Sequence, residues 1–202
     1  MVEMHLLSVN ADFSYNAIYA LGVVTTFERF MQDYQPEREK DSIFSALLQA
    51  VQEDPQRYKH DAQRLESLAQ SLPASELIAW LSQTRPLEQD IEFQSSLAEI
   101  ADNPNFKYNR LFAIGIFSLL ELSNPELAKD EKQRTEALKS IANGLRLSDD
   151  KLNKDLDLYR SNLDKMTQAR VVMADILSAD RKKREKRDQQ SSTTVAPPAT
   201  NE

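Results

Sequence analysis

Prolines divide this sequence into segments in which apolar residues recur with the period of an α-helix. The chain has 202 residues, with three glycines and eight prolines. Proline is tolerated at helix starts and in loops but not in helix interiors, and no stretch alternates apolar and polar residues for long. The sequence therefore predicts an all-α fold. Six prolines fall between the periodic segments: Pro36, Pro55, Pro73, Pro86, Pro104 and Pro125.

The expected helices follow from this periodicity and from candidate capping residues. They span residues 2–9, 16–33, 38–53, 55–71, 75–83, 87–102, 109–123, 125–143 and 148–187.

We expect these helices to form a multi-helix globular bundle followed by one long helix. The bundle comprises residues 1–147, and residues 148–187 form a coiled-coil-like C-terminal helix whose distal part projects. The polar, proline-containing stretch 188–202 is expected to be disordered. Gly144 is a candidate C′ residue, where a left-handed conformation suits glycine. The first expected helix begins directly after Met1 without a capping residue, which suggests a cut through a longer helix.

One stretch of the sequence occurs twice. Residues 13–28 read FSYNAIYALGVVTTFE and residues 106–121 read FKYNRLFAIGIFSLLE, with identical residues at six positions of a constant alignment. Asn16 and Asn109 precede the apolar runs and are expected to cap the two helices. The repetition reflects either a doubled ancestral hairpin or convergence on one packing solution.

Each copy places a glycine inside an expected helix, where glycine costs about 1 kcal/mol relative to alanine. Gly22 is followed by Thr25, and Gly115 is followed by Ser118, so each helix carries a shallow notch. We interpret the notches as sites of close helix packing between two central helices. The alternative is a pocket for a ligand or pigment.

The last expected helix carries an apolar seam at steps of four and three residues, which is a heptad pattern. The seam runs through Leu152, Leu156, Tyr159, Leu163 and Met166. Its proximal half, 148–166, either packs on the body or binds a partner. The distal half carries apolar side chains that need cover and favour a partner: Val171, Val172, Met173, Ile176 and Leu177. The candidate partner-binding residues are Leu163, Met166, Met173, Ile176 and Leu177.

A basic run follows this seam in an otherwise acidic chain. The net charge is −7, whereas residues 1–180 hold 19 basic and 29 acidic residues, a net charge of −10. The basic run suits an anionic lipid surface or an acidic protein. Nucleic acid is disfavoured, because the body is acidic and no aromatic residue interleaves the run. The basic residues are Arg181, Lys182, Lys183, Arg184, Lys186 and Arg187.

The sequence contains no recognisable catalytic or metal-binding pattern. Cysteine is absent and only two histidines occur, His5 and His60. No glycine-rich phosphate loop, nucleophile elbow or HExxH motif is present, and no run reaches the length of about 18 apolar residues needed to span a bilayer. We therefore expect no enzyme activity, no cofactor and no metal site.

Four stretches occur in order: YNAIYALGVVTTFERFMQDY, IFSALLQAVQEDPQRYKHDAQRLESLA, FKYNRLFAIGIFSLLEL and LNKDLDLYRSNLDKMTQA. Together they resemble the thylakoid formation protein family of cyanobacteria and plants, also described as photosystem II biogenesis proteins. The resemblance covers about residues 2–187. In the family, a further segment usually precedes the part equivalent to VEMHLLSVN. The lack of a transit peptide resembles the cyanobacterial members.

The resemblance implies a non-enzymatic accessory factor in photosystem II biogenesis and repair, peripheral to the cytoplasmic side of the thylakoid membrane. Its implied partner is the thylakoid FtsH-type protease complex, with photosystem II subunits and an anionic membrane surface as further candidates. We expect the distal helix to dock on the protease. The alternatives are a self-associating helical structural protein and a pigment or lipid carrier.

Overall fold

The computed structural model describes residues 2–193, with side chains up to Lys183 and that of Glu185. The chain divides into two compact units, residues 1–159 and residues 160–202. No β-strand occurs among residues 2–193, so the predicted all-α fold is confirmed.

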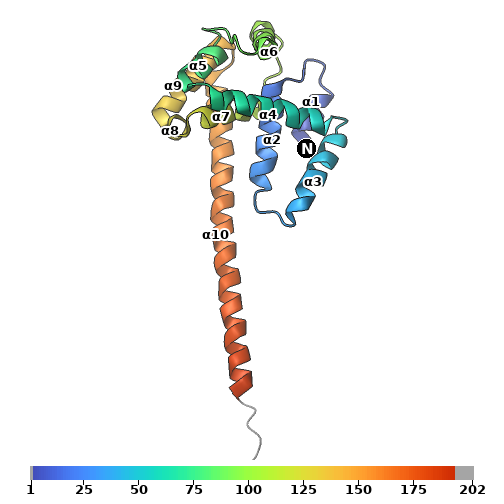
Figure 1. Cartoon of the computed structure of the whole chain (residues 1–202), viewed down its shortest axis with the longest axis vertical. Coiled ribbons are helices and arrows are strands. Elements are labelled where there is room, and N and C mark those ends of the chain that lie inside the picture. Colours follow the sequence, from blue (N-terminus) through green and yellow to red (C-terminus); the bar gives the residue numbers. More distant parts are fainter. Residues whose placement is uncertain (1, 194–202) are drawn as a thin grey trace, which may run out of the picture. The chain divides into compact units, whose positions relative to one another are not determined.

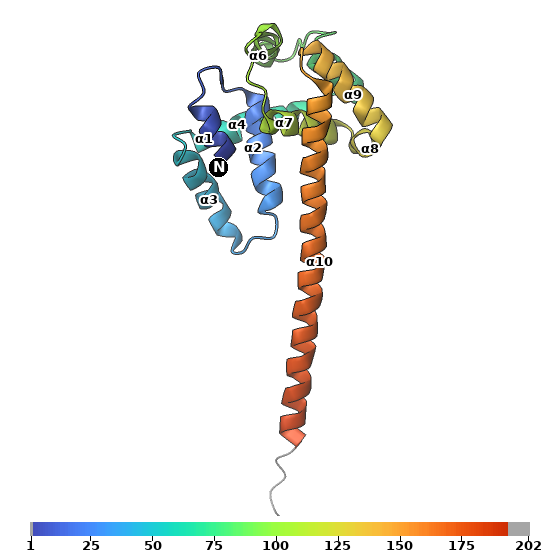
Figure 2. The same ribbon diagram turned by 180° about the vertical axis from the view of Figure 1, so that it is seen from behind.

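Figures 1 and 2 show the helices in chain order. Their bounds are α1 Val2–Ser8, α2 Ala17–Phe30, the 3-10 helix η1 Glu37–Glu39, α3 Lys40–Gln49, α4 Pro55–Ser71, α5 Ala74–Leu81, α6 Ile91–Asp102, α7 Arg110–Ser123, α8 Pro125–Lys129, α9 Glu131–Gly144 and α10 Asp149–Thr193.

Side-chain caps start several of these helices where the sequence predicts them. The side chain of Asn16 accepts a hydrogen bond from the Tyr19 amide at 2.9 Å, and Asn109 accepts one from the Phe112 amide at 2.9 Å. The Ser148 hydroxyl accepts one from the Lys151 amide at 3.3 Å. These bonds satisfy amide groups that have no partner inside the helix.

Most expected helices differ from the observed ones by up to four residues at their ends, and two differ more. The single helix expected at 125–143 is wrong, because Asp130 adopts an extended conformation (ψ 117°) that separates α8 from α9. Its side chain accepts a hydrogen bond from the Gln133 amide, so it caps α9. The last helix ends at Thr193 rather than at residue 187, since no proline or glycine interrupts residues 188–193. Residues 194–202 of the expected tail lie outside the described residues.

Gly144 is not the left-handed C′ residue that its position suggested. No glycine of the chain has a positive φ, whereas Arg146 does, at 55°. Gly144 is instead the last residue of α9, and a Cβ atom there would lie 2.1 Å from the carbonyl oxygen of Ser82. Glycine is required because the backbone after α5 passes against α9.

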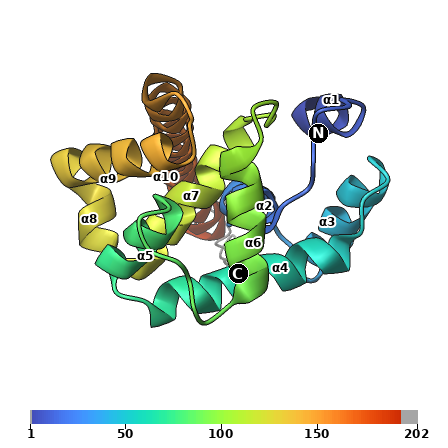
Figure 3. The same cartoon turned by 90° about the horizontal axis from the view of Figure 1, so that it is seen from above.

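The core of the first unit is built on the crossing of α2 and α7 (Figures 1 and 2). A Cβ atom on Gly22 would lie 1.7 Å from the carbonyl oxygen of Leu111, and one on Gly115 would lie 1.9 Å from that of Ile18. The contact is reciprocal, because Ile18 and Leu111 hold the same place in the two copies of the repeated stretch. Figure 3 shows α7 near the middle of this unit, with α3 and α4 on one side and α8 and α9 on the other.

The repetition extends beyond the two stretches that the sequence reveals. The Tyr15 hydroxyl donates to Asp61 of α4 at 2.7 Å, and the equivalent Tyr108 donates to Asp155 of α10 at 2.9 Å. A basic side chain covers each of these rings: Arg57 lies 3.7 Å from the ring centroid of Tyr15, and Lys151 lies 4.8 Å from that of Tyr108. Helix α4 is therefore equivalent to the first part of α10.

The loops before these two helices also match. Gln52 has φ 63° and Arg146 has φ 55°, although left-handed conformations are uncommon outside glycine. The next residue makes the same backbone hydrogen bond in both loops. The Glu53 amide donates to the Leu48 carbonyl, and the Leu147 amide donates to the Ala142 carbonyl. Helix packing alone does not require a shared loop conformation. The structure therefore favours a doubled ancestral unit, with α2, α3 and α4 repeated as α7, α9 and the start of α10.

We expect Gly115→Leu to destabilise the first unit strongly, because the added Cβ meets a backbone carbonyl that no side-chain rotation can move. Overpacking costs about 1–3 kcal/mol, so the melting temperature should fall by about 2–12 °C. Thermal unfolding followed by circular dichroism measures it. Ala46→Leu, on the exposed face of α3, is the control and should change the melting temperature by less than about 2 °C. Equal melting temperatures for the two variants would show that the crossing is not close-packed.

Candidate functional site: an apolar stripe on α10 and a groove beside α2

The distal part of α10 exposes the apolar residues that the sequence marks as partner-binding. Met173, Ile176 and Leu177 are 60%, 53% and 65% exposed, and Val171 and Val172 are similarly open to solvent. Leu163 and Met166 are half-buried. Large apolar side chains with this exposure are unusual when they occur together.

Four of these side chains form a continuous apolar stripe. Residues four apart are neighbours on a helix surface, so Val172 lies beside Ile176 and Met173 lies beside Leu177. The α10 stripe is defined here as these four residues. Val171 faces the other side of the helix, because each residue turns by about 100°.

The basic run follows the α10 stripe on the same helix. Lys182 and Lys183 are exposed, and Arg181 pairs with Glu185 four residues later at 3.1 Å. The side chains of Arg184, Lys186 and Arg187 lie outside the described residues. Lys182 and Lys183 thus face solvent, and neither forms an ion pair with another residue that the structure describes.

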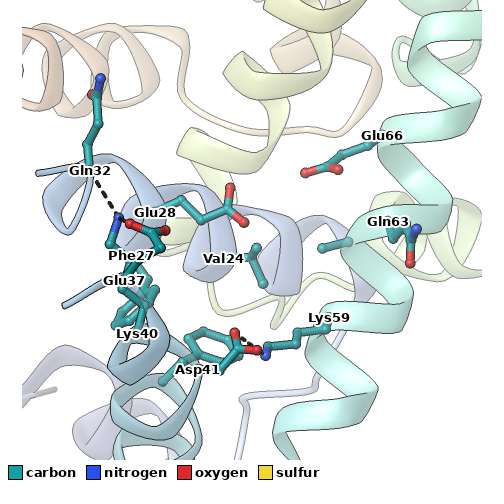
Figure 4. Close-up of a pocket in the computed structure, with 12 residues that line it drawn as sticks. Val24, Phe27, Glu28, Gln32, Glu37, Lys40, Asp41, Lys59, Gln63 and Glu66 are labelled. Atoms are coloured by element: carbon teal, nitrogen blue, oxygen red, sulfur yellow. Dashed lines mark hydrogen bonds and ion pairs between the residues drawn. The ribbon is translucent and has the colours of Figure 1, made fainter. Parts of the chain in front are cut away.

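A second candidate surface lies in the first unit, between α2, α3 and α4 (Figure 4). It is a groove of about 570 Å³ with an apolar floor, to which Val24, Phe27, Phe44 and Ala62 contribute. The rings of Phe27 and Phe44 meet edge to face at 5.0 Å between centroids. This groove beside α2 was not predicted from the sequence.

Two carboxylates dominate one end of the groove. Glu28 of α2 and Glu66 of α4 extend toward each other across it (Figure 4). Glu28 is exposed and Glu66 is half-buried. Partial desolvation of the two carboxyl groups raises the pKa of both, and the charge of Glu28 raises the pKa of Glu66 further. Neither side chain makes a hydrogen bond or ion pair with another described residue.

The cations beside the groove are engaged by other acids. Lys59 pairs with Asp41 at 2.9 Å, and Lys40 pairs with Glu37 at 2.7 Å. Lys59 and Arg29 lie close enough to oppose the rise in the pKa of Glu28, but burial outweighs them.

The candidate packing residues lie in the crossing of α2 and α7 and form no open site. The notches at Gly22 and Gly115 hold the backbone of the facing helix, which leaves no room there for a pigment or lipid. Thr25 and Ser118 are buried, and the Ser118 hydroxyl donates to the Ile114 carbonyl at 2.8 Å within its own helix. The caps Asn16 and Asn109 are buried as well.

The described residues contain no group of three or more potential metal-ligating side chains close enough to hold an ion. None of their helices combines the length and the apolar character that crossing a membrane requires.

Comparison with known proteins places the chain among relatives of one kind. A family model described as "Thylakoid formation protein" matches residues 1–188. "Protein Thf1" of Trichormus variabilis is 74% identical over 198 residues, which cover 98% of this chain and 85% of the relative. "Protein Thf1" of Nostoc punctiforme is 70% identical over 202 residues, covering 100% and 86%. A solved structure of Psb29 is 38% identical with a TM-score of 0.75, covering 91% of this chain and 84% of that one.

The paired carboxylates should reduce stability at neutral pH. Because their pKa values are raised on folding, they contribute stability that is fully present below the unfolded pKa of about 4.3 and is lost as the pH rises through the folded pKa. Replacing both by glutamine (E28Q/E66Q) removes this titration. The variant should melt about 1–3 °C above the parent at pH 7.5, and this advantage should shrink or reverse at pH 4. Melting curves at several pH values measure the difference.

A matched variant, E99Q/E136Q, removes the same charge from exposed positions in the interiors of α6 and α9. If it gains as much stability at pH 7.5 as E28Q/E66Q does, the effect comes from net charge and not from the groove.

Proposed function

The chain belongs to the thylakoid formation protein family, and we propose that it is a non-enzymatic accessory factor in photosystem II biogenesis and repair. In this proposal it binds and supports the thylakoid FtsH-type protease complex, at the cytoplasmic side of the cyanobacterial thylakoid membrane. The names of the family, of Protein Thf1 and of Psb29 support a role in thylakoid or photosystem II biogenesis.

The observation that carries the protein-binding part of the proposal is the α10 stripe. Its residues are between 53% and 65% exposed, on a helix that is otherwise rich in charged residues. Covering the stripe against a partner would remove apolar surface from water, which is favourable by about 25 cal/mol per Å². A helix laid by its apolar face into a groove of another protein is a common recognition mode.

The basic run gives the proposal a second contact. Cations next to a membrane surface with anionic lipids are attracted by about 1 kcal/mol each. Lys182 and Lys183 are exposed and available for that contact. The helix would thus combine an apolar contact to the protease with an electrostatic contact to the membrane.

A test of the protease contact is Met173→Gln with Leu177→Gln, which makes half of the α10 stripe polar. Exposed substitutions rarely change stability by more than about 0.5 kcal/mol, so the fold should persist. Recovery of the FtsH-type protease from thylakoid membranes by the tagged protein should fall at least fivefold, as measured by quantitative mass spectrometry.

The matched control is Ala174→Gln with Ser178→Gln, which adds the same side chains to the opposite face of the helix. It should recover the protease as the parent does. Unchanged recovery by the stripe variant, or equal loss with both variants, would assign the contact elsewhere.

The membrane contact is tested with vesicles that contain anionic phosphatidylglycerol. Lys182→Gln with Lys183→Gln should weaken binding about tenfold or more, and binding of the parent should fall as salt rises because the charges are screened. Vesicle sedimentation at low and high salt measures both effects. Lys132→Gln with Lys139→Gln, at exposed positions of α9, removes the same charge and should leave binding unchanged. Salt-independent binding would contradict an electrostatic contact.

A further inference from the structure

The two repeated halves of the first unit differ where the groove beside α2 lies. In the first half, Val24 and Ala62 form part of the groove floor. Their equivalents in the second half are Phe117 and Leu156, which are larger and are buried at 3% and 2% exposure. Val24 and Ala62 are themselves buried, at 7% and 1% exposure, and the equivalents of Phe27 and Phe44 are the smaller Leu120 and Leu138. The two halves therefore place different side chains on the same helical framework.

In the second half, the carboxylate equivalent to Glu28 is paired with a guanidinium. That residue is Glu121, and the guanidinium of Arg29 donates a hydrogen bond to it. The same guanidinium lies over the ring of Tyr159, 5.9 Å from its centroid. The pKa of Arg29 is raised: burial acts to lower it, but the hydrogen bond to Glu121 and the neighbouring charges outweigh burial. The second half thus holds a guanidinium between a carboxylate and an apolar surface.

No arginine stands at the equivalent sequence position facing Glu28. The residue equivalent to Arg29 is Leu122. It lines a neighbouring hollow together with Glu28 and Glu66, and the cations Arg29 and Lys129 line that hollow as well. By the same correspondence Glu66 takes the place of Arg160 in the sequence. The first half therefore has two carboxylates where the second has one carboxylate and a cation.

We propose that the groove beside α2 binds an arginine side chain on an amphipathic helix of a partner protein. The planar guanidinium can bridge two carboxylates with several N–H donors, which the compact ammonium of lysine does not do as well. The apolar floor at Phe27 and Phe44 takes the methylene stem and the neighbouring apolar residues of the helix. The acidic balance of residues 1–180, a net charge of −10, attracts such a helix.

This site is independent of the proposed function, because it uses residues of α2, α3 and α4 and none of the α10 stripe. If the groove binds no arginine, the proposed contact between the α10 stripe and the protease is not affected.

The probe is a fluorescein-labelled alanine–leucine helix of roughly 18 residues, long enough to be helical alone, with one central arginine. Its binding to the full chain is followed by fluorescence anisotropy. We expect saturable binding that weakens about tenfold or more when citrulline, the neutral isostere, replaces the arginine, since a hydrogen bond to a charged group is worth about that factor. The E28Q/E66Q variant should lose binding similarly, and the exposed-site control E99Q/E136Q should retain it.

Three results would overturn the proposal. Equal binding of the arginine and citrulline peptides would show that the groove takes apolar surface alone. Equal binding by E28Q/E66Q and by the parent would place the contact elsewhere. Full competition by free arginine amide at the peptide's own concentration would assign the site to a small cation.

The remaining occupant is a second copy of this chain, which carries its own basic helix. Sedimentation of the full chain separates the two cases. A monomer is expected, whereas a dimer that E28Q/E66Q dissociates would assign the groove to self-association and overturn the partner protein.

Discussion

The close contact of α2 with α7 is the constraint on which the first unit depends. Each helix has a glycine at the contact, so that a backbone carbonyl of the other helix can approach closely. Gly22 of α2 meets the carbonyl of Leu111, and Gly115 of α7 meets that of Ile18. Because helix interiors disfavour glycine by about 1 kcal/mol, the gain must come from the contact itself. The reciprocal geometry places the two copies face to face, as in a symmetric dimer interface contained within one chain.

The rest of the first unit follows from this arrangement. Each central helix is preceded by a tyrosine that bonds to the first turns of a later helix, Tyr15 to Asp61 and Tyr108 to Asp155. Burial, with the neighbouring aspartate, raises the pKa of both phenols, so they remain neutral donors. The tyrosine contacts fix α4 and the start of α10 against the crossing in the same way.

The two halves differ in the side chains that they place beside their central helices. Val24 and Ala62 of the groove floor correspond to the larger Phe117 and Leu156, and the first half carries the groove beside α2, with two acids at its end. The helix lengths also differ: α4 ends before Pro73, whereas α10 meets no proline until Pro197 and extends to Thr193. The first half thus carries a groove, whereas the helix that continues beyond the second half carries an exposed apolar stripe.

Much of this fold could be read from the sequence, because local signals decide helices. Proline spacing and apolar periodicity gave the all-α class, and the capping asparagines marked the starts of α2 and α7. The α10 stripe was also predictable, since apolar residues near a basic run stand out in a charged helix. The break at Asp130 was missed because an aspartate is compatible with both a helix interior and a cap.

The sequence by itself determined the helices, the two glycine notches and the repetition of one stretch, since each depends on residues close together along the chain. Only the tertiary structure decided that the notches face each other, that the repetition extends to α4 and α10, and that Gly144 serves a close contact with Ser82. It also brought Glu28 and Glu66 together across the groove beside α2. Such contacts join residues far apart in sequence, and their positions depend on how helices pack.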